Sequence, residues 1–167
     1  LVLPDQLTIE VGPVARAIAE KPSTTSILVL ESRASWKRPR HIQALVSEVL
    51  AARKYVAALQ SVGAQAQLLR CDELTDGFQT LRSERKIGRV VLMEPASPEQ
   101  LVEIRDAAGA ASIEVAVVAN ELWLTTREEW ANFRNGRRDL RMEHWYRRAR
   151  TSYGWLMEEG ADGPRPI

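Results

Sequence analysis

The sequence predicts an α/β protein with a doubly wound, five-stranded, mostly parallel sheet of the Rossmann-like type, followed by extra C-terminal helices. Two observations lead to this prediction. Short runs of valine, isoleucine and leucine recur without polar alternation, as in strands that are buried on both faces. Segments whose apolar residues follow helical spacing separate these runs, and connections of that length join parallel strands rather than hairpins.

The five apolar runs are the expected strands, and the segments between them are the expected helices. Pro4 stops the first run. Residues 41–60 form the longest helix, because their apolar side chains recur every three or four positions and Gly63 suits its end. Gly88 closes the next helix, and Ser97-Pro98 suits the first turn of the last one. The expected strands are 1–3, 26–30, 66–69, 89–93 and 113–118, and the expected helices are 14–19, 41–60, 75–86 and 97–108.

The character of the chain changes after Asn120. Thr126 and Glu129 form a capping-box pair that predicts a helix ending at Gly136, and a last helix is expected over 140–155. Between residues 127 and 150, eight arginines stand against four acidic residues, and four of the five tryptophans follow Glu121. We therefore expect an α/β domain over 1–120, a helical extension and interdomain seam over 121–160, and the start of a linker over 161–167.

Composition and charge exclude several classes of protein. An apolar fraction of 45% and a charged fraction of 27% fit an ordinary globular core, and 23 basic against 22 acidic residues exclude a supercharged nucleic-acid-binding arm. The single cysteine, Cys71, cannot form an internal disulfide, a cysteine-based zinc site or an iron–sulfur cluster of four thiolates. No apolar run approaches the roughly 20 residues that span a bilayer. We expect no membrane contact, no metal site and a reducing, cytoplasmic location.

In doubly wound sheets, ligands bind beyond the carboxyl ends of the strands, so polar residues there are candidates for a site. Asp5 and Gln6 follow the first expected strand, Glu31 follows the second, and Glu94 follows the fourth. Asp5 is either a ligand contact or a carboxylate that accepts backbone N–H groups in a tight turn. Glu31 and Glu94 are either ligand contacts or solvated strand ends. Neither Gly-x-Gly-x-x-Gly nor a P-loop occurs, so dinucleotide binding of the Rossmann type and P-loop phosphate transfer are not expected.

Two further segments are open to more than one interpretation. Residues 36–40 (Trp-Lys-Arg-Pro-Arg) mix an aromatic ring with basic side chains, which suits contact with a phosphate or a planar ring, or a solvated loop. The arginine-rich end of the chain suits a helix whose aromatic stripe packs while the arginines stay in water, or a nucleic-acid-binding surface.

Several motifs follow one another along almost the whole chain. They are Asp5-Gln6-Leu7, the run Ile27-Leu28-Val29-Leu30-Glu31-Ser32-Arg33-Ala34, Glu94-Pro95, the stretch Arg141-Met142-Glu143-His144-Trp145-Tyr146-Arg147-Arg148, and Gly154-Trp155-Leu156-Met157. In this order they resemble the start of the deoxyribodipyrimidine photolyase-related proteins, which are the bacterial iron–sulfur cryptochromes and (6-4) photolyases.

The resemblance implies an N-terminal α/β domain that holds an antenna pigment, 6,7-dimethyl-8-ribityllumazine, in members that carry one. It implies that Asp5 and Gln6 contact the pigment, beside Leu30 and Glu31 at the end of the second strand. Trp36 takes the place of the family's aromatic wall, and Glu94 belongs to the same expected site. Pro4 stands where relatives have glycine.

The resemblance also implies a C-terminal helical domain that binds FAD and a four-cysteine [4Fe–4S] cluster, and that repairs (6-4) photoproducts or senses blue light. We expect this chain to be the N-terminal part of such a flavoprotein, without repair activity by itself. The expected partners are the helical FAD domain and, through the parent protein, damaged DNA, and homo-association of the chain is expected as well. The alternative is a stand-alone nucleotide- or protein-binding α/β module without photochemistry.

Overall fold

The structure is a computed structural model that describes residues 1–20, 25–160 and 163–166. The chain divides into two compact units, Leu1–Leu122 and Trp123–Ile167, and each is described by itself. Within the described residues, no helix is both long enough and apolar enough to cross a bilayer.

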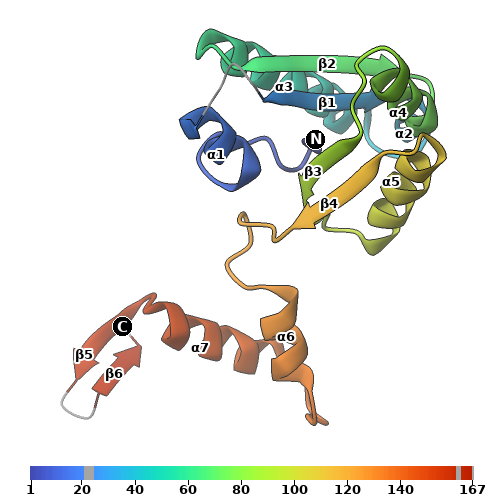
Figure 1. Cartoon of the computed structure of the whole chain (residues 1–167). Coiled ribbons are helices and arrows are strands. Elements are labelled where there is room, and N and C mark those ends of the chain that lie inside the picture. The colour runs from blue at the N-terminus through green and yellow to red at the C-terminus, as the bar shows by residue number, and fades with distance from the viewer. Residues whose placement is uncertain (21–24, 161–162, 167) are drawn as a thin grey trace. The chain divides into compact units, whose positions relative to one another are not determined.

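The first unit alternates helices and strands, as the sequence predicts (Figure 1). The elements are α1 (Gly12–Glu20), β1 (Ser26–Ser32), α2 (Arg33–Trp36), α3 (Ile42–Ser61), β2 (Gln65–Cys71), α4 (Leu74–Ser83), β3 (Arg89–Met93), α5 (Pro98–Ala110) and β4 (Glu114–Val118).

Side-chain caps fix the starts of the main helices. The Ser97 hydroxyl accepts a hydrogen bond from the Gln100 N–H at 3.3 Å, and Pro98 occupies the first turn of α5, as predicted. The His41 ring accepts from the Gln43 N–H at the start of α3. These caps satisfy N–H groups that have no partner inside the helix. The short helix α2 was not predicted, because four residues are too few to show a periodic pattern.

The strands form two parallel pairs instead of the single five-stranded sheet that the sequence predicts. β1 pairs with β2 from Ser26↔Gln65 to Ser32↔Cys71, and β3 pairs with β4 from Arg89↔Glu114 to Met93↔Val118. The mixed α/β class is therefore confirmed, whereas one continuous sheet is not.

Residues 1–3, the first expected strand, form no strand of their own. Val2 makes one parallel bridge to Val29, and the Leu1 amine donates to the Val91 carbonyl at 2.7 Å. The segment therefore lies between β1 and β3 (Figure 1). Pro4 has no N–H to continue the ladder, so these three residues supply too few hydrogen bonds for a regular strand.

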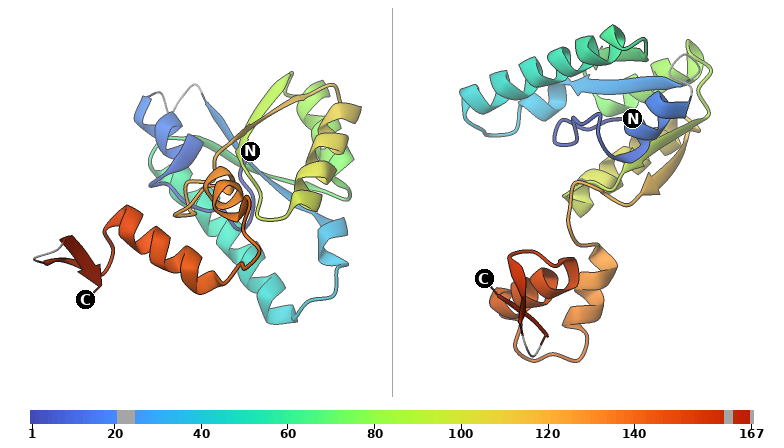
Figure 2. Two further views of the ribbon diagram at one scale, coloured as in Figure 1. Left: turned by 90° about the horizontal axis from the view of Figure 1, so that it is seen from below. Right: turned by 90° about the vertical axis from the view of Figure 1, so that its left-hand side faces the viewer.

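The core of this unit consists of two hydrophobic clusters on opposite faces of β1. Leu28 belongs to a cluster with Phe78 of α4, which is fully buried. Val29 belongs to a second cluster with Leu59 of α3, also fully buried. Neighbouring residues of a strand point to opposite faces, so α3 and α4 cover the β1–β2 pair from its two sides (Figure 2).

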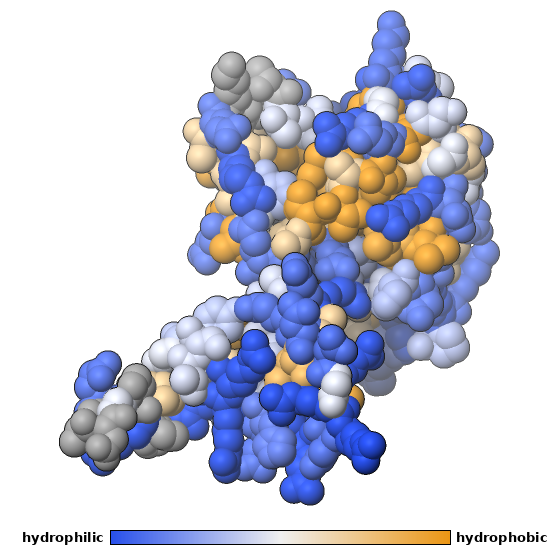
Figure 3. All heavy atoms as spheres, turned by 60° about the horizontal axis from the view of Figure 1, so that its bottom comes forward, coloured by the Kyte–Doolittle hydropathy of each residue, from blue (hydrophilic) through white to orange (hydrophobic). Residues whose placement is uncertain are grey.

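The face of β3 that carries Val91 is less covered. Val90 and Leu92 are buried against α4 and α5, whereas Val91 between them is 37% exposed. A broad hydrophobic area is visible on the surface of this unit (Figure 3).

The second unit contains α6 (Arg127–Arg134), α7 (Met142–Tyr153), β5 (Met157–Gly160) and β6 (Gly163–Pro166). The predicted capping box is present, because the Thr126 hydroxyl accepts from the Glu129 N–H and the Glu129 carboxylate accepts from the Thr126 N–H. α7 ends at Gly154, whose φ of 66° is a left-handed conformation that suits glycine.

Residues 163–166 of the expected linker form β6, which pairs antiparallel with β5. The sequence missed this hairpin because two of the four residues of β6 are prolines, which are rare in strands. Residues 161, 162 and 167 of the same expected linker lie outside the described residues.

Replacement of Gly12 by alanine is expected to destabilise the first unit. Gly12 has a φ of 79°, and an added Cβ would lie 2.6 Å from the Met93 sulfur. The left-handed conformation alone costs an alanine about 1–2 kcal/mol. Gly109→Ala is the matched control, because Gly109 lies in α5 with open space around it, and there alanine is expected to add about 0.5–1 kcal/mol. Urea unfolding measures both values, and equal stability of the two variants would contradict the prediction.

Candidate functional site

A cleft of about 930 Å³ lies beyond the carboxyl end of β1 in the first unit. Leu30 and Ser32 of β1 reach it, together with residues from α3, α4 and α5. Its volume falls in the upper part of the range of about 300–1,000 Å³ that is usual for small-molecule sites. It lies where ligands bind in open parallel sheets.

The cleft combines an apolar wall with polar groups at its edge. Leu30, Phe78 and Ile104 supply apolar surface from β1, α4 and α5. Polar side chains line the same space, and they are Asp5, Ser32, Ser35, Arg38, Arg40, Ser47, Glu48, Glu73, Thr75, Gln100, Glu103 and Asp106. Such a combination suits a planar molecule that carries hydroxyl or amide groups.

Two arginines of the segment 36–40 form ion pairs at the cleft. Arg38 Nη2 lies 2.6 Å and 2.7 Å from the two carboxylate oxygens of Glu103 in α5. Arg40 Nη1 lies 2.6 Å from Glu48 Oε2 in α3, and its Nη2 donates to the Ser35 carbonyl at 2.8 Å. Charged hydrogen bonds therefore connect this segment to α3 and α5 at the cleft.

Asp5 and Leu30 are the two expected site residues that line the large cleft. Asp5 is exposed, and Leu30 is half-buried. Asp5 lies in the turn after residues 1–3, where the Gln6 N–H donates to the Leu3 carbonyl at 2.9 Å. The Asp5 side chain thus comes within reach of a ligand beside the apolar wall.

The side chain of Gln6 contacts the backbone of Glu94, and neither residue lines the large cleft. Gln6 is 1% exposed, and its side-chain amide donates to the carbonyls of Met93 at 3.2 Å and Glu94 at 3.0 Å. The Asn120 side chain donates to the same Glu94 carbonyl at 2.9 Å. Gln6 therefore ties the turn that carries Asp5 to the end of β3.

Glu31 is buried on the other face of β1. Its Oε2 lies 2.8 Å from Arg70 Nε on β2 and 3.8 Å from Arg53 Nη2 on α3. Its Oε1 is buried and has no hydrogen-bond partner within the described part of the chain. Of the two interpretations of Glu31, the solvated strand end is wrong, because only 5% of the side chain is exposed.

Trp36 is half-buried and lines a second cavity of about 30 Å³ with Pro4, Leu30, Glu31 and Ser35. This space holds about one water molecule. The structure therefore brings Trp36 and Glu31 together beside the large cleft, with Pro4 and Leu30 common to both spaces.

The sequence did not identify the apolar wall of the cleft. Phe78 and Ile104 looked like ordinary core positions of two separate helices, since their burial and their access to a cleft depend on where α4 and α5 pack. Glu103 and Glu48 carried no signal either, because the arginines with which they pair are 65 and eight residues away in the sequence.

Cys71 does not have the character of a reactive thiol. Its side chain lies at the end of β2 against Gly77 of α4, and burial raises the pKa of the Cys71 thiol above its usual value. Among the described residues, no group of three or more His, Cys, Asp or Glu side chains is placed to hold a metal ion.

The first unit is a mixed α/β domain with a cleft beyond the carboxyl end of β1. The sequence matches the family described as deoxyribodipyrimidine photo-lyase-related protein over residues 1–165. This chain belongs to that family, which confirms the resemblance seen in the motifs.

A curated relative is similar along the whole chain. A protein of Agrobacterium fabrum (strain C58 / ATCC 33970) named (6-4) photolyase is 26% identical over 173 residues. The aligned region covers 100% of this chain and 33% of that protein. The chain thus spans about a third of the length of this relative.

Loss of the Arg70 side chain is expected to destabilise the chain through Glu31. Arg70→Met would leave a buried carboxylate without its 2.8 Å partner, at a cost of about 1–3 kcal/mol. Arg53→Met is the matched control, because this guanidinium is 3.8 Å away and its loss should cost below about 1 kcal/mol. Chemical denaturation near neutral pH measures the difference, and similar losses in both variants would contradict the assignment.

Proposed function

We propose that this chain is the N-terminal α/β domain of a photolyase- or cryptochrome-related flavoprotein that acts in light-dependent DNA repair or blue-light sensing. The family match over residues 1–165 carries the proposal. The cleft at the strand ends supports it, because it provides a small-molecule site of suitable size in this unit.

The two parallel strand pairs belong, in this proposal, to one doubly wound sheet of Rossmann-like order. Residues 1–3 lie between them, with a bridge from Val2 to Val29 on one side and a hydrogen bond from Leu1 to Val91 on the other. The order is then β2, β1, residues 1–3, β3 and β4. In such an order the connections on either side of the first strand run in opposite directions, which opens a site beyond its carboxyl end.

The proposed ligand of the cleft is a ribityllumazine antenna pigment, which absorbs blue light and passes the excitation energy to a flavin. The residues present fit such a molecule. Leu30, Phe78 and Ile104 offer an apolar wall for the flat ring system, and Asp5 and Gln100 offer polar groups for the ribityl hydroxyls. Gln6 and Glu94 hold the turn, and Glu31 and Trp36 shape the adjacent wall.

FAD and the [4Fe–4S] cluster belong, in this proposal, to a C-terminal helical domain of the parent protein. This chain has a single cysteine, and a [4Fe–4S] cluster needs four thiolates. The cofactor supplies the redox chemistry, while the protein domains position it.

The helical end of the chain is proposed as the seam to that C-terminal domain. Trp130, Phe133 and Trp145 pack together, with ring centroids 5.0–5.7 Å apart. On the same unit, Met142 is 65% exposed and Tyr146 54% exposed. Aromatic side chains, methionine and arginine are enriched at protein interfaces. One face of α7 therefore packs internally and the other remains available for a partner.

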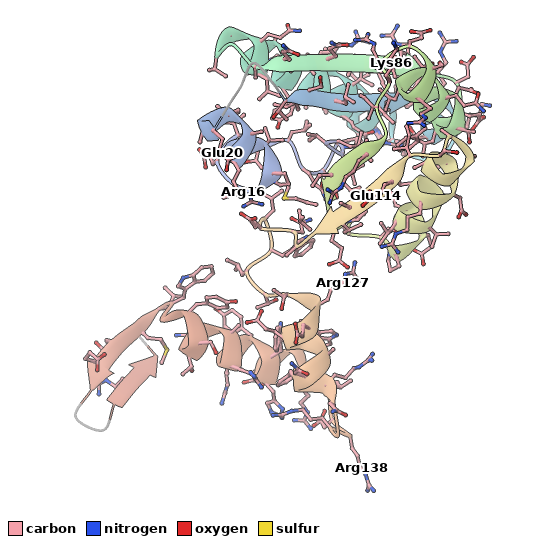
Figure 4. All side chains as sticks on the ribbon, viewed as in Figure 1. Arg16, Glu20, Lys86, Glu114, Arg127 and Arg138 are labelled. Carbon is pink, nitrogen blue, oxygen red and sulfur yellow. The ribbon has the colours of Figure 1, made fainter. Side chains whose placement is uncertain are left out.

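The arginines of this unit are proposed to serve interdomain contacts rather than DNA. Arg147 pairs with Glu143 at 2.6 Å, and Arg150 donates to the Leu156 carbonyl at 2.6 Å. Arg137 stacks over the Phe133 ring at 4.3 Å. Arg138 extends away from the ribbon (Figure 4). Arg137, Arg147 and Arg150 therefore already have partners within the unit, which favours a structural role over DNA contacts. In this proposal, damaged DNA is bound by the parent protein.

Titration with 6,7-dimethyl-8-ribityllumazine is expected to shift the absorbance of the pigment and quench its fluorescence, because the ring leaves water for an apolar wall. Asp5→Ala is expected to weaken binding about tenfold, which corresponds to the loss of about 1.4 kcal/mol. Asp72→Ala is the control, since Asp72 is exposed after β2 and does not line the cleft. An unchanged pigment spectrum would contradict the pigment site.

The purified chain is expected to contain no stoichiometric FAD and to repair no (6-4) photoproducts under blue light. The reason is that the proposed flavin and cluster sites belong to another domain. Absorption spectroscopy and a repair assay with the full-length parent as positive control measure these properties, and bound FAD in the chain would overturn the division of roles.

The isolated chain is expected to self-associate through α7, because exposed apolar patches promote association. Met142→Glu with Tyr146→Glu should shift sedimentation velocity toward the monomer. Leu50→Glu is the control, since Leu50 is 49% exposed on α3 in the other unit. A dimer that resists the α7 changes, or tight and steeply salt-dependent binding to duplex DNA, would contradict the seam.

A further inference from the structure

The turn after α6 carries an asparagine that is followed directly by a glycine. Asn135 caps the C-terminal end of α6, and Gly136 follows with a φ of 72°. Both residues are exposed, and nothing lies within 4 Å of the place that a Cβ on Gly136 would take. The backbone of Gly136 can therefore approach the Asn135 side chain without crowding from a side chain of its own or of a neighbour. We call residues 134–138 (Arg-Asn-Gly-Arg-Arg) the arginine turn.

Two groups of the arginine turn make no hydrogen bonds. Within the described part of the chain, neither the side-chain amide of Asn135 nor the N–H of Gly136 has a hydrogen-bond partner. The backbone around them is held. The Asn135 N–H donates to the Ala131 carbonyl at 3.0 Å, and the Arg137 N–H donates to the Arg134 carbonyl at 3.1 Å. The turn is thus anchored at both ends, while the amide and the glycine nitrogen remain open to water.

The other two asparagines of the chain lack this combination. The Asn120 side chain donates to the Glu94 carbonyl at 2.9 Å and accepts from the Leu122 N–H at 3.1 Å, so both ends of its amide are used. Asn132 lies inside α6, and the next residue is Phe133, which is buried. Backbone N–H groups inside a helix donate to the carbonyl four residues earlier. Neither asparagine therefore combines an open amide with an open N–H on the next residue.

We propose that Asn135 is a site of spontaneous covalent modification, at which the folded chain loses ammonia and gains a carboxylate. The nitrogen of Gly136 gives its proton to the solvent and forms a bond to Cγ of Asn135. The bond between Cγ and Nδ2 then breaks, ammonia leaves with a proton from the solvent, and a succinimide ring joins the two residues. Water opens this ring at either of the two bonds to its nitrogen and gives aspartate or isoaspartate. Water is the co-reactant, and no group is oxidised or reduced.

The arginines of the turn favour this reaction and balance the charge of its product. Arg134, Arg137 and Arg138 have no carboxylate partner within the described residues. Nearby positive charge favours the deprotonated nitrogen of Gly136 and the oxyanion that forms at Asn135. The new carboxylate changes the formal net charge of the chain from +1 to zero. The proposal concerns the chemistry of one turn, so it stands independently of pigment binding and of the seam.

Incubation of the purified chain in mildly alkaline, heavy-oxygen water tests the proposal, since each hydrolysed ring then carries a heavy oxygen atom. Chymotryptic peptides are analysed by mass spectrometry. Asn135 is expected to convert about tenfold faster than Asn120 or Asn132, which corresponds to a barrier lower by about 1.36 kcal/mol. Isoelectric focusing should show a more acidic species, and methyl transfer by an isoaspartate methyltransferase should label the peptide that contains position 135.

Asn135→Gln is the matched control, because glutamine keeps the amide but has to close a larger ring, which forms more slowly. This variant is expected to remain uniform in charge through the same incubation. A free peptide with the sequence of residues 133–138 gives the rate without the fold, and Asn135 in the folded chain is expected to react within about tenfold of it. Stronger protection of Asn135 by the fold, or conversion of Asn120 or Asn132 before Asn135, would overturn the proposal.

Discussion

The burial of β1 on both faces is the constraint on which the first unit depends. Leu28 and Val29 are neighbours in the strand and point into different hydrophobic clusters. Each such side chain contributes about 1.5–3 kcal/mol when it leaves water. One face of the strand therefore requires α3 and the other requires α4, with β2 paired along the edge. This arrangement places residues of β1, α3 and α4 around the cleft, together with residues of α2 and α5.

The turn after residues 1–3 connects the end of β3 to the cleft. Gln6 is buried because its amide satisfies two carbonyls at the end of β3, and a buried amide without such partners would be costly. The same hydrogen bonds place Asp5 beside the apolar wall of Leu30 and Phe78. A residue that looked like a ligand contact in the sequence thus fixes the position of its neighbour.

Charge pairing shapes the remaining edge of the cleft. Arg38 and Arg40 each find a carboxylate on a different helix, so the segment after α2 carries little unbalanced charge. Residues 37–40 of the segment are exposed, as expected of a solvated loop, but Arg38 and Arg40 pair with carboxylates on α5 and α3. Five acidic side chains and two arginines line the cleft, and this excess of negative charge favours an uncharged ring system over a phosphate, which agrees with the proposed pigment.

The sequence by itself determined the alternation of β1 to β4 with α3, α4 and α5, the caps of α5 and α6, and the family. These are local properties, because apolar periodicity and capping depend on residues within a few positions of one another. The strand-end argument predicted Asp5 and the family resemblance predicted Leu30 as site residues, and both line the cleft.

The tertiary structure alone decided which of the predicted residues face one another. Alternation along β1 turns Leu30 toward the cleft and Glu31 away from it, to Arg70 on the neighbouring strand. The apolar wall likewise depends on α4 and α5 packing together. The pairing of residues 1–3 was also decided by the tertiary structure. Val2 bridges to Val29 and Leu1 donates to Val91, which are 27 and 90 residues away, and local sequence patterns do not encode hydrogen bonds over such separations.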